Sequence, residues 1–215
     1  GQSMRKRQSP KRKPSKKQEQ VQEKPTVEIK TVEFDTTEIE QHQNVLFKPN
    51  AGPQTDFLAA AEREVLFGGS AGGGKSYAML SDPLRYMGHP AFSGLLLRHT
   101  TEELRELVFK SQELYPKIWP GIKWSERKMQ WTAPSGARLW MSYLDRDDDV
   151  LRYQGLAFSW IGFDELTQWS TPYAWNYMRS RLRSTAQDLP IFMRATTNPG
   201  GRGHHWVKKM FIDPA

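Results

Sequence analysis

Short apolar runs alternate with amphipathic segments along the chain, and this pattern predicts buried strands that alternate with helices. The runs Val65–Phe67, Leu95–Leu97, Ser159–Phe163 and Ile191–Thr196 are each bounded by polar or turn residues, as strands of a parallel sheet usually are. Helical segments are expected between them. The alternation predicts an α/β fold with a parallel sheet as its core.

The expected helices have recognisable starts or ends. One begins at about Tyr77 and should kink or end near Pro83. A second opens at the capping box Thr100–Glu103, in which a threonine is followed three residues later by glutamate, and runs to about Leu114. A third covers Tyr173–Ser184.

Two further segments have strand character. Trp124–Trp131 and Arg138–Leu144 read as the arms of a hairpin around the Ala133–Gly136 turn. Val27–Phe34 alternates apolar and polar residues and is a candidate edge strand. The expected organisation is a tail at residues 1–24, an edge strand and linker at 25–48, and one folded domain at 49–215.

The net positive charge of the chain is concentrated in an N-terminal tail. Residues 1–24 contain nine lysines and arginines and two glutamates, a net charge of +7, which equals the net charge of the whole chain. This segment has almost no apolar residues, so we expect it to be disordered. Its charge suits either a sequence-independent grip on nucleic acid or a merely solubilising tail. The chain has no cysteine and no 18-residue apolar run, so no disulfide and no membrane-spanning segment is expected.

The most specific motif follows the first predicted strand. The eight residues match the phosphate-loop pattern G-x-x-x-x-G-K-[ST] at every specified position; they are Gly69, Ser70, Ala71, Gly72, Gly73, Gly74, Lys75 and Ser76. Glycines let successive backbone N–H groups point inward around phosphate oxygens, and the following helix N-terminus adds to the attraction. Lys75 is expected to reach the terminal phosphates of ATP, and the Ser76 hydroxyl to ligate Mg²⁺.

A second chemical site follows about ninety residues later, where the strand Ser159–Phe163 ends in Asp164 and Glu165. At the carboxyl edge of a parallel sheet, Asp164 can hold Mg²⁺ while Glu165 orients and deprotonates the attacking water. Gly162 is unexpected inside this strand, since a bulky apolar residue is usual there.

Two amides are candidates for contacts to the nucleotide. The Gln54 side chain has a donor and an acceptor that match the N6/N7 edge of adenine, although a helix N-terminal glutamine facing solvent is the alternative. Asn198 follows the strand that ends at Thr196, and its amide can lie near the γ-phosphate and so detect whether the phosphate bond is intact. The alternative is that Asn198-Pro199-Gly200 is simply a turn, a common way to end a strand.

Two other clusters are weaker metal candidates. The acidic run Asp145–Asp149 lacks a glycine at the turn position and a downstream glutamate, so a solvated loop is favoured over a cation site. His204 and His205, expected in an extended segment, would point to opposite sides, and no third ligand is evident.

The order of these motifs resembles the large terminase subunit of tailed bacteriophages, the motor that packages viral DNA. The similar stretches are a Gly-Pro-Gln turn at 52–54, the loop at 68–76, the Asp164-Glu165 strand end, an Arg-Leu-Arg helix at 181–183 and a Thr-Thr-Asn-Pro-Gly-Gly strand end at 196–201. The resemblance covers residues 49–214. It implies a P-loop ATPase fold of the RecA-like kind that hydrolyses ATP to translocate DNA.

The same resemblance implies partners and roles. Double-stranded DNA, a portal protein and a small terminase subunit would be the partners, and the chain would form a homo-oligomeric ring when active, with a monomer in isolation as the alternative. Its place would be the host bacterial cytoplasm, at the procapsid portal. Gln54 would contact adenine, and Thr196, Thr197 and Asn198 would couple hydrolysis to motion.

The chain departs from the family pattern in two respects. Family members normally carry a nuclease domain after the ATPase. Because the residues up to Ala215 offer neither room nor an acidic metal cluster for one, we expect an isolated ATPase domain without nuclease activity. Some members also place an arginine before a glycine about ten residues upstream of the catalytic glutamate, where this chain has Gln154-Gly155. Arg152 is the favoured catalytic arginine, and its rivals are Arg98, Arg179, Arg181 and Arg183.

Two other functions fit parts of the sequence. One is a different nucleic-acid ATPase, such as a helicase. The other is a DNA-binding protein that keeps a relic ATP site.

Overall fold

A computed structural model describes residues 63–67, 74–184, 186–198 and 200–212. Several sequence predictions lie outside these ranges: the basic tail, the edge strand at 27–34, the adenine contact Gln54, and residues 69–73 of the phosphate loop. The described part begins immediately before the strand that leads to this loop and resumes at Gly74.

The described residues form a seven-stranded mixed sheet with the order β1-β7-β6-β2-β5-β4-β3. Its five parallel strands are β1 (Glu64–Phe67), β2 (Ser93–Arg98), β5 (Arg138–Tyr143), β6 (Trp160–Phe163) and β7 (Phe192–Thr196). The antiparallel strands are β3 (Lys123–Ser125) and β4 (Gln130–Thr132). The predicted α/β fold with a parallel core is therefore confirmed.

Strand order separates the two predicted chemical motifs by one strand. β1 leads into the phosphate loop and β6 ends at the two acids, and β7 pairs with both of them. Because all three strands run parallel, their carboxyl ends meet at the same edge of the sheet.

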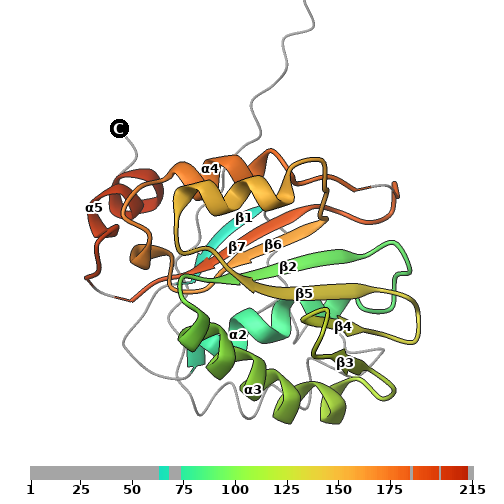
Figure 1. Cartoon of the computed structure of the whole chain (residues 1–215). Helices are drawn as coiled ribbons and strands as arrows, with labels where there is room; N and C mark the ends of the chain where they lie inside the picture. The colour runs from blue at the N-terminus through green and yellow to red at the C-terminus, as the bar shows by residue number, and fades with distance from the viewer. Residues whose placement is uncertain (1–62, 68–73, 185, 199, 213–215) are drawn as a thin grey trace, which may run out of the picture.

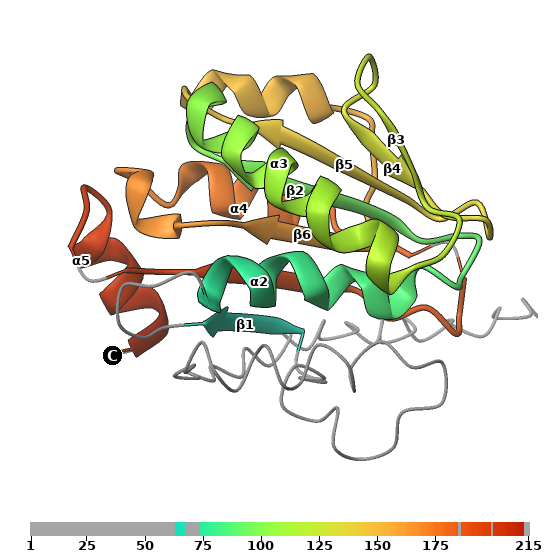
Figure 2. The ribbon, with the colours of Figure 1, turned by 90° about the horizontal axis from the view of Figure 1, so that it is seen from below.

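Helices cover both faces of the sheet (Figures 1 and 2). On one face lie α2 (Gly74–Ser81), the 3-10 helix η2 (Asp82–Tyr86) and α3 (Thr101–Ile118). On the other lie the 3-10 helices η3 (Asp147–Tyr153) and η4 (Leu166–Gln168), with α4 (Tyr173–Arg179), α5 (His204–Val207) and the π-helical turn η5 (Lys208–Ile212). Each face buries its own apolar cluster against the sheet, as doubly covered parallel sheets require.

Most predicted elements are confirmed, and the differences have local causes. α2 ends at Ser81, two residues before Pro83, as expected. α3 begins after Thr100, whose side chain accepts a hydrogen bond from the Glu103 backbone N–H, and it continues past the predicted end to Ile118. The hairpin is also confirmed, but the prediction that its first arm, Trp124–Trp131, is a single strand was wrong. A turn with a positive φ of 50° at Met129 divides it into β3 and β4.

Three polar segments differ from their predicted conformations. Asp147–Asp149 are not an open loop but form the first turn of η3, because the Asp149 carboxylate accepts the N–H groups of Asp145 and Arg146. His204 and His205 lie in the short helix α5 rather than in an extended segment. α4 ends at Arg179, earlier than expected.

In the part of the chain that the structure describes, no helix combines the length and the apolar character needed to cross a membrane.

Candidate active site

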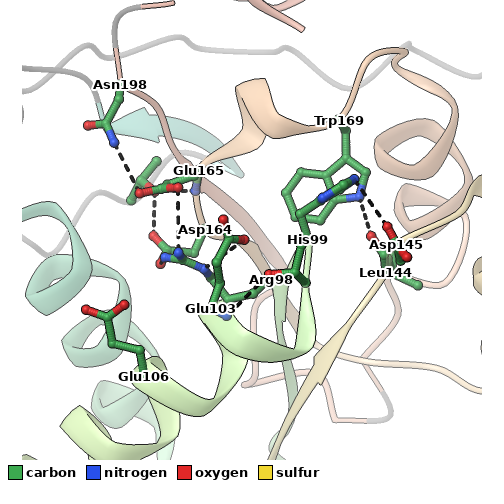
Figure 3. Close-up of polar contacts among 12 residues, drawn as sticks. Arg98, His99, Glu103, Glu106, Leu144, Asp145, Asp164, Glu165, Trp169 and Asn198 are labelled. Atoms are coloured by element: carbon green, nitrogen blue, oxygen red, sulfur yellow. Dashed lines mark hydrogen bonds and ion pairs between the residues drawn. The ribbon is translucent and has the colours of Figure 1, made fainter. Parts of the chain in front are cut away.

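Four chain segments meet at the carboxyl edge of the sheet. β6 is followed directly by Asp164 and Glu165, β7 ends at Thr196 and leads into Asn198, and β2 ends at Arg98. The beginning of α2 supplies Lys75. Figure 3 shows the acids, Arg98 and Asn198 pointing toward one another from these separate elements.

Lys75 is held against the end of β7. Its ammonium donates to the Thr197 carbonyl oxygen at 2.7 Å and to Asn198 Oδ1 at 2.5 Å. Burial lowers the pKa of Lys75, while the nearby carboxylates of Glu165 and Asp164 act to raise it. The cation therefore sits at the end of β7, beside the two acids.

Asn198 joins the two motifs that the sequence separates by ninety residues. Its Oδ1 accepts from Lys75, and its Nδ2 donates to Glu165 Oε1 at 3.2 Å. One amide therefore contacts both the predicted phosphate-binding lysine and the predicted base. Asn198 is therefore not a turn residue whose side chain faces only solvent, and its contact with the γ-phosphate stays a prediction.

Asp164 is buried, with 1% of its surface exposed. Its Oδ1 accepts a hydrogen bond from Thr196 Oγ1 at 2.6 Å, and its Oδ2 is in direct contact with Arg98 Nη1. The same Thr196 hydroxyl accepts the Glu165 backbone N–H at 2.8 Å. Thr196 therefore fixes both acids relative to β7, because a hydroxyl can donate and accept at once.

Glu165 has a left-handed backbone conformation, with φ 57° and ψ 62°. A non-glycine residue pays a free-energy cost in this region, and such residues cluster at functional sites. Burial raises the pKa of Glu165, with Arg98 acting to lower it and Asp164 to raise it further. A carboxylate with a raised pKa is a better proton acceptor, which suits a general base.

Arg98 lies between three carboxylates. Its Nη1 contacts Asp164, its Nη2 lies 3.6 Å from Glu165 Oε2, and its Nε lies 3.8 Å from Glu103 Oε2. Burial acts to lower the pKa of Arg98, but the neighbouring carboxylates, Asp164 foremost, outweigh it, so that the pKa is raised and the guanidinium stays charged. Arg98 therefore balances the negative charge of the acid pair.

The donors present fit a hydrated Mg²⁺ and a polyphosphate. Asp164 supplies hard carboxylate oxygens, and Ser76 lines a cavity of about 70 Å³ together with Glu165 and Arg98. Mg²⁺ typically takes only one or two protein oxygens and keeps waters or phosphates as its other ligands. Among the described residues, no three acidic or histidine side chains gather as a metal cage.

The structure places the candidate arginines at different ends of the sheet. Arg179 forms an ion pair with the buried Glu64 at the first residue of β1, which is the amino edge. The backbones of Arg181 and Arg183 bond to Phe158, just before β6 begins, so they too lie at that edge. Of the five candidates, Arg98 alone contacts the acid pair within the described residues.

Arg152 lies at the carboxyl edge but one strand further out. Its guanidinium donates to the Tyr143 carbonyl oxygen at 2.6 Å and lies 3.8 Å from Asp149 Oδ2, and 44% of its side chain is exposed. Tyr143 is paired in register with Arg98. Arg152 is therefore on the surface beside the site rather than in it.

Sequence reasoning missed the role of Arg98 as the partner of Asp164, and it assigned Glu103 only to a helix cap, not to the site. Two signals were available: Arg98 ends a buried strand, as the two acids do, and Glu103 is the third helical residue of a capping box that starts beside it. Neither signal could reveal that β2 pairs directly with β6.

Comparison with protein families gives a match over most of the chain. The family model described as "Terminase large subunit, T4likevirus-type, N-terminal" matches residues 66–215. A search of curated proteins returned no match.

Solved structures with a similar fold include two phage proteins. The large terminase of a thermophilic bacteriophage in complex with ADP is 16% identical, with a TM-score of 0.56, over 81% of this chain and 41% of that chain. The HK97 bacteriophage large terminase is 11% identical, with a TM-score of 0.54, over 75% and 36%. The chain thus spans about two fifths of these proteins, and the likeness confirms the predicted P-loop, RecA-like fold.

Proposed function

The chain belongs to the family of T4-like terminase large subunits, in their N-terminal part, and on this premise we propose that it is the ATPase motor of a phage DNA-packaging machine. The observation that carries the proposal is the contact of one amide, Asn198, with both Lys75 and Glu165. It supports the proposal because the lysine proposed to bind phosphate and the glutamate proposed as general base contact the same side chain.

In this proposal, each residue has one role in ATP hydrolysis. Lys75 would bind the terminal phosphates, together with backbone N–H groups of the phosphate-loop motif. Ser76 and Asp164 would hold Mg²⁺, which would supply positive charge that neutralises the phosphates. Glu165 orients the attacking water and accepts its proton. Asn198 holds the Glu165 carboxylate near Lys75 by hydrogen bonding to both side chains.

Gln54 contributes the adenine contact in the same proposal. Arg152 would be the catalytic arginine that one subunit supplies to the ATP site of its neighbour. It is exposed at the carboxyl edge of the sheet and makes no contact with the acids of its own chain's site. The motor would act on double-stranded DNA as a homo-oligomeric ring, together with a portal protein and a small terminase subunit, at the procapsid portal in the host cytoplasm.

ATP turnover by wild-type protein and two site variants tests the proposal. Lys75→Ala should lose both nucleotide binding and turnover. Glu165→Gln should keep binding but turn over ATP at least about a hundredfold more slowly, because it cannot accept a proton. The assay is run with Mg²⁺ and double-stranded DNA at high protein concentration, so that a ring can form.

Exposed residues on α3 provide matched controls: Lys117→Ala removes a lysine, and Glu113→Gln removes a carboxylate, both outside the site. Equal turnover by the wild type and the two site variants would refute the catalytic assignments. ATP binding without turnover by the assembled wild type would instead identify a nucleotide-binding protein without a motor.

A further inference from the structure

The guanidinium of Arg98 forms ion pairs with the carboxylates of both Asp164 and Glu165. It contacts Asp164 Oδ2 directly and lies 3.6 Å from Glu165 Oε2, while Thr196 occupies the other Asp164 oxygen. A divalent cation that binds the Asp164 carboxylate would therefore lie close to the positively charged guanidinium of Arg98. Because like charges close together repel, the cation and Arg98 compete for the same carboxylate oxygens.

A second partner lies on the far side of the same guanidinium. Glu103 Oε2 is buried and has no hydrogen-bond partner among the described residues, and Arg98 Nε is likewise buried and makes no hydrogen bond there. The two atoms are 3.8 Å apart, beyond hydrogen-bond distance. Buried polar atoms of this kind usually find partners, so this pair is poised to close.

The space needed for the movement exists. The cavity of about 70 Å³ is lined by Arg98 and Glu103 together with Ser76, Glu106 and Glu165. Figure 3 shows Glu103 and Glu106 on α3 beside Arg98 and the acid pair. A small rotation of the guanidinium would strengthen its contact to Glu103 while weakening its contact to Asp164.

We propose that Arg98 is a positioning residue with two alternative partners: it neutralises Asp164 and Glu165 when the site is empty, and it transfers to Glu103 when a divalent cation and nucleotide occupy the site. This inference rests on the proposed ATPase function and adds a residue pair to it. Because Glu103 lies in the first turn of α3, the transfer ties nucleotide occupancy to the position of that helix.

The proposal predicts opposite effects on Mg²⁺ dependence. The measurement is the Mg²⁺ concentration that gives half-maximal binding of a fluorescent ADP derivative. Arg98→Gln removes the competitor and should lower this midpoint at least about fivefold. Glu103→Gln removes the alternative partner and should raise it at least about twofold.

A double-mutant cycle separates this mechanism from a simple electrostatic field. If Glu103 acts through Arg98, Glu103→Gln has no effect on the midpoint in the Arg98→Gln background. Glu106→Gln removes a carboxylate from the same cavity and should shift the midpoint equally in both backgrounds. Arg105→Gln removes an exposed arginine on α3 and should leave the midpoint unchanged.

An equal effect of Glu103→Gln in both backgrounds would overturn the proposal, as would an unchanged midpoint for Arg98→Gln. Should Arg98→Gln not fold, the cycle is run with Arg98→Lys. Lysine keeps the charge but lacks the fork that contacts several carboxylates, so the Glu103→Gln effect must fall by more than half. A wild type that binds no nucleotide at any Mg²⁺ concentration would refute the ATPase function itself.

Discussion

Gly162 is the position at which adding one methyl group should be most informative. It lies in β6, two residues before Asp164, and its missing side chain leaves room for two neighbours. A Cβ atom built there would overlap the ring of Trp160, 2.9 Å from Cζ3 and closer still to Cη2, and would lie 2.8 Å from Met79 Sδ. The glycine that was unexpected from the sequence therefore has a steric reason.

Trp160 cannot move aside easily. The indole is fully buried, and its Nε1 donates to the Asp82 carboxylate at 2.8 Å. Asp82 is held in turn by Arg85 at 2.7 Å and by Arg194 at 3.2 Å. Met79 is more adaptable, but it belongs to α2, the helix that carries Lys75, so displacing it also disturbs the site.

Gly162→Ala should therefore reduce the free energy of unfolding by about 3 kcal/mol, at the upper end of the range for overpacked cores. For a domain of this size, that corresponds to a fall in Tm of roughly 6–12 °C. Urea unfolding followed by tryptophan fluorescence measures the first quantity, and calorimetry the second.

Gly88→Ala is the matched control. Its Cβ would meet only Trp119, at an ordinary 3.6 Å, so its free energy of unfolding should stay within about 0.5 kcal/mol of wild type. Adding Trp160→Phe to Gly162→Ala should give less than the sum of the two single effects, since the smaller ring removes the overlap. A Gly162→Ala protein as stable as the Gly88→Ala protein would refute this steric account.

Three further predictions concern single polar groups. Asp82→Ala removes a fully buried carboxylate that forms an ion pair with the buried Arg194 and should cost about 3–5 kcal/mol in urea unfolding; a loss below about 1 kcal/mol would contradict this. Thr100→Ala removes the N-cap of α3 and should cost about 1 kcal/mol, whereas Thr100→Ser should cost less than half of that. Asn198→Ala should slow ATP turnover roughly ten- to a hundredfold while changing ADP affinity little, because Glu165 loses its tether; unchanged turnover would rule out this role.

The strands and the residues that gather at the candidate site were largely predictable from local patterns. Val65–Phe67 and Leu95–Leu97 read as buried strands because continuous apolar runs suit a sheet covered on both faces. Asp164 and Glu165 were recognisable because two acids directly follow such a strand. The turn at Met129 and the helical conformation of His204 and His205 were not predictable. Contacts with residues distant in sequence, rather than local preference, decide where such short segments bend.

The sequence by itself determined which side chains can bind phosphate, hold a cation and accept a proton, because those properties belong to residue types and their order along the strands. The tertiary structure alone decided which side chains meet. Pairing of β2 with β6 brings Arg98 to the acids, and insertion of β7 between β1 and β6 lets Asn198 contact both Lys75 and Glu165. Strand order depends on packing across the whole sheet, and no local stretch of sequence contains that information.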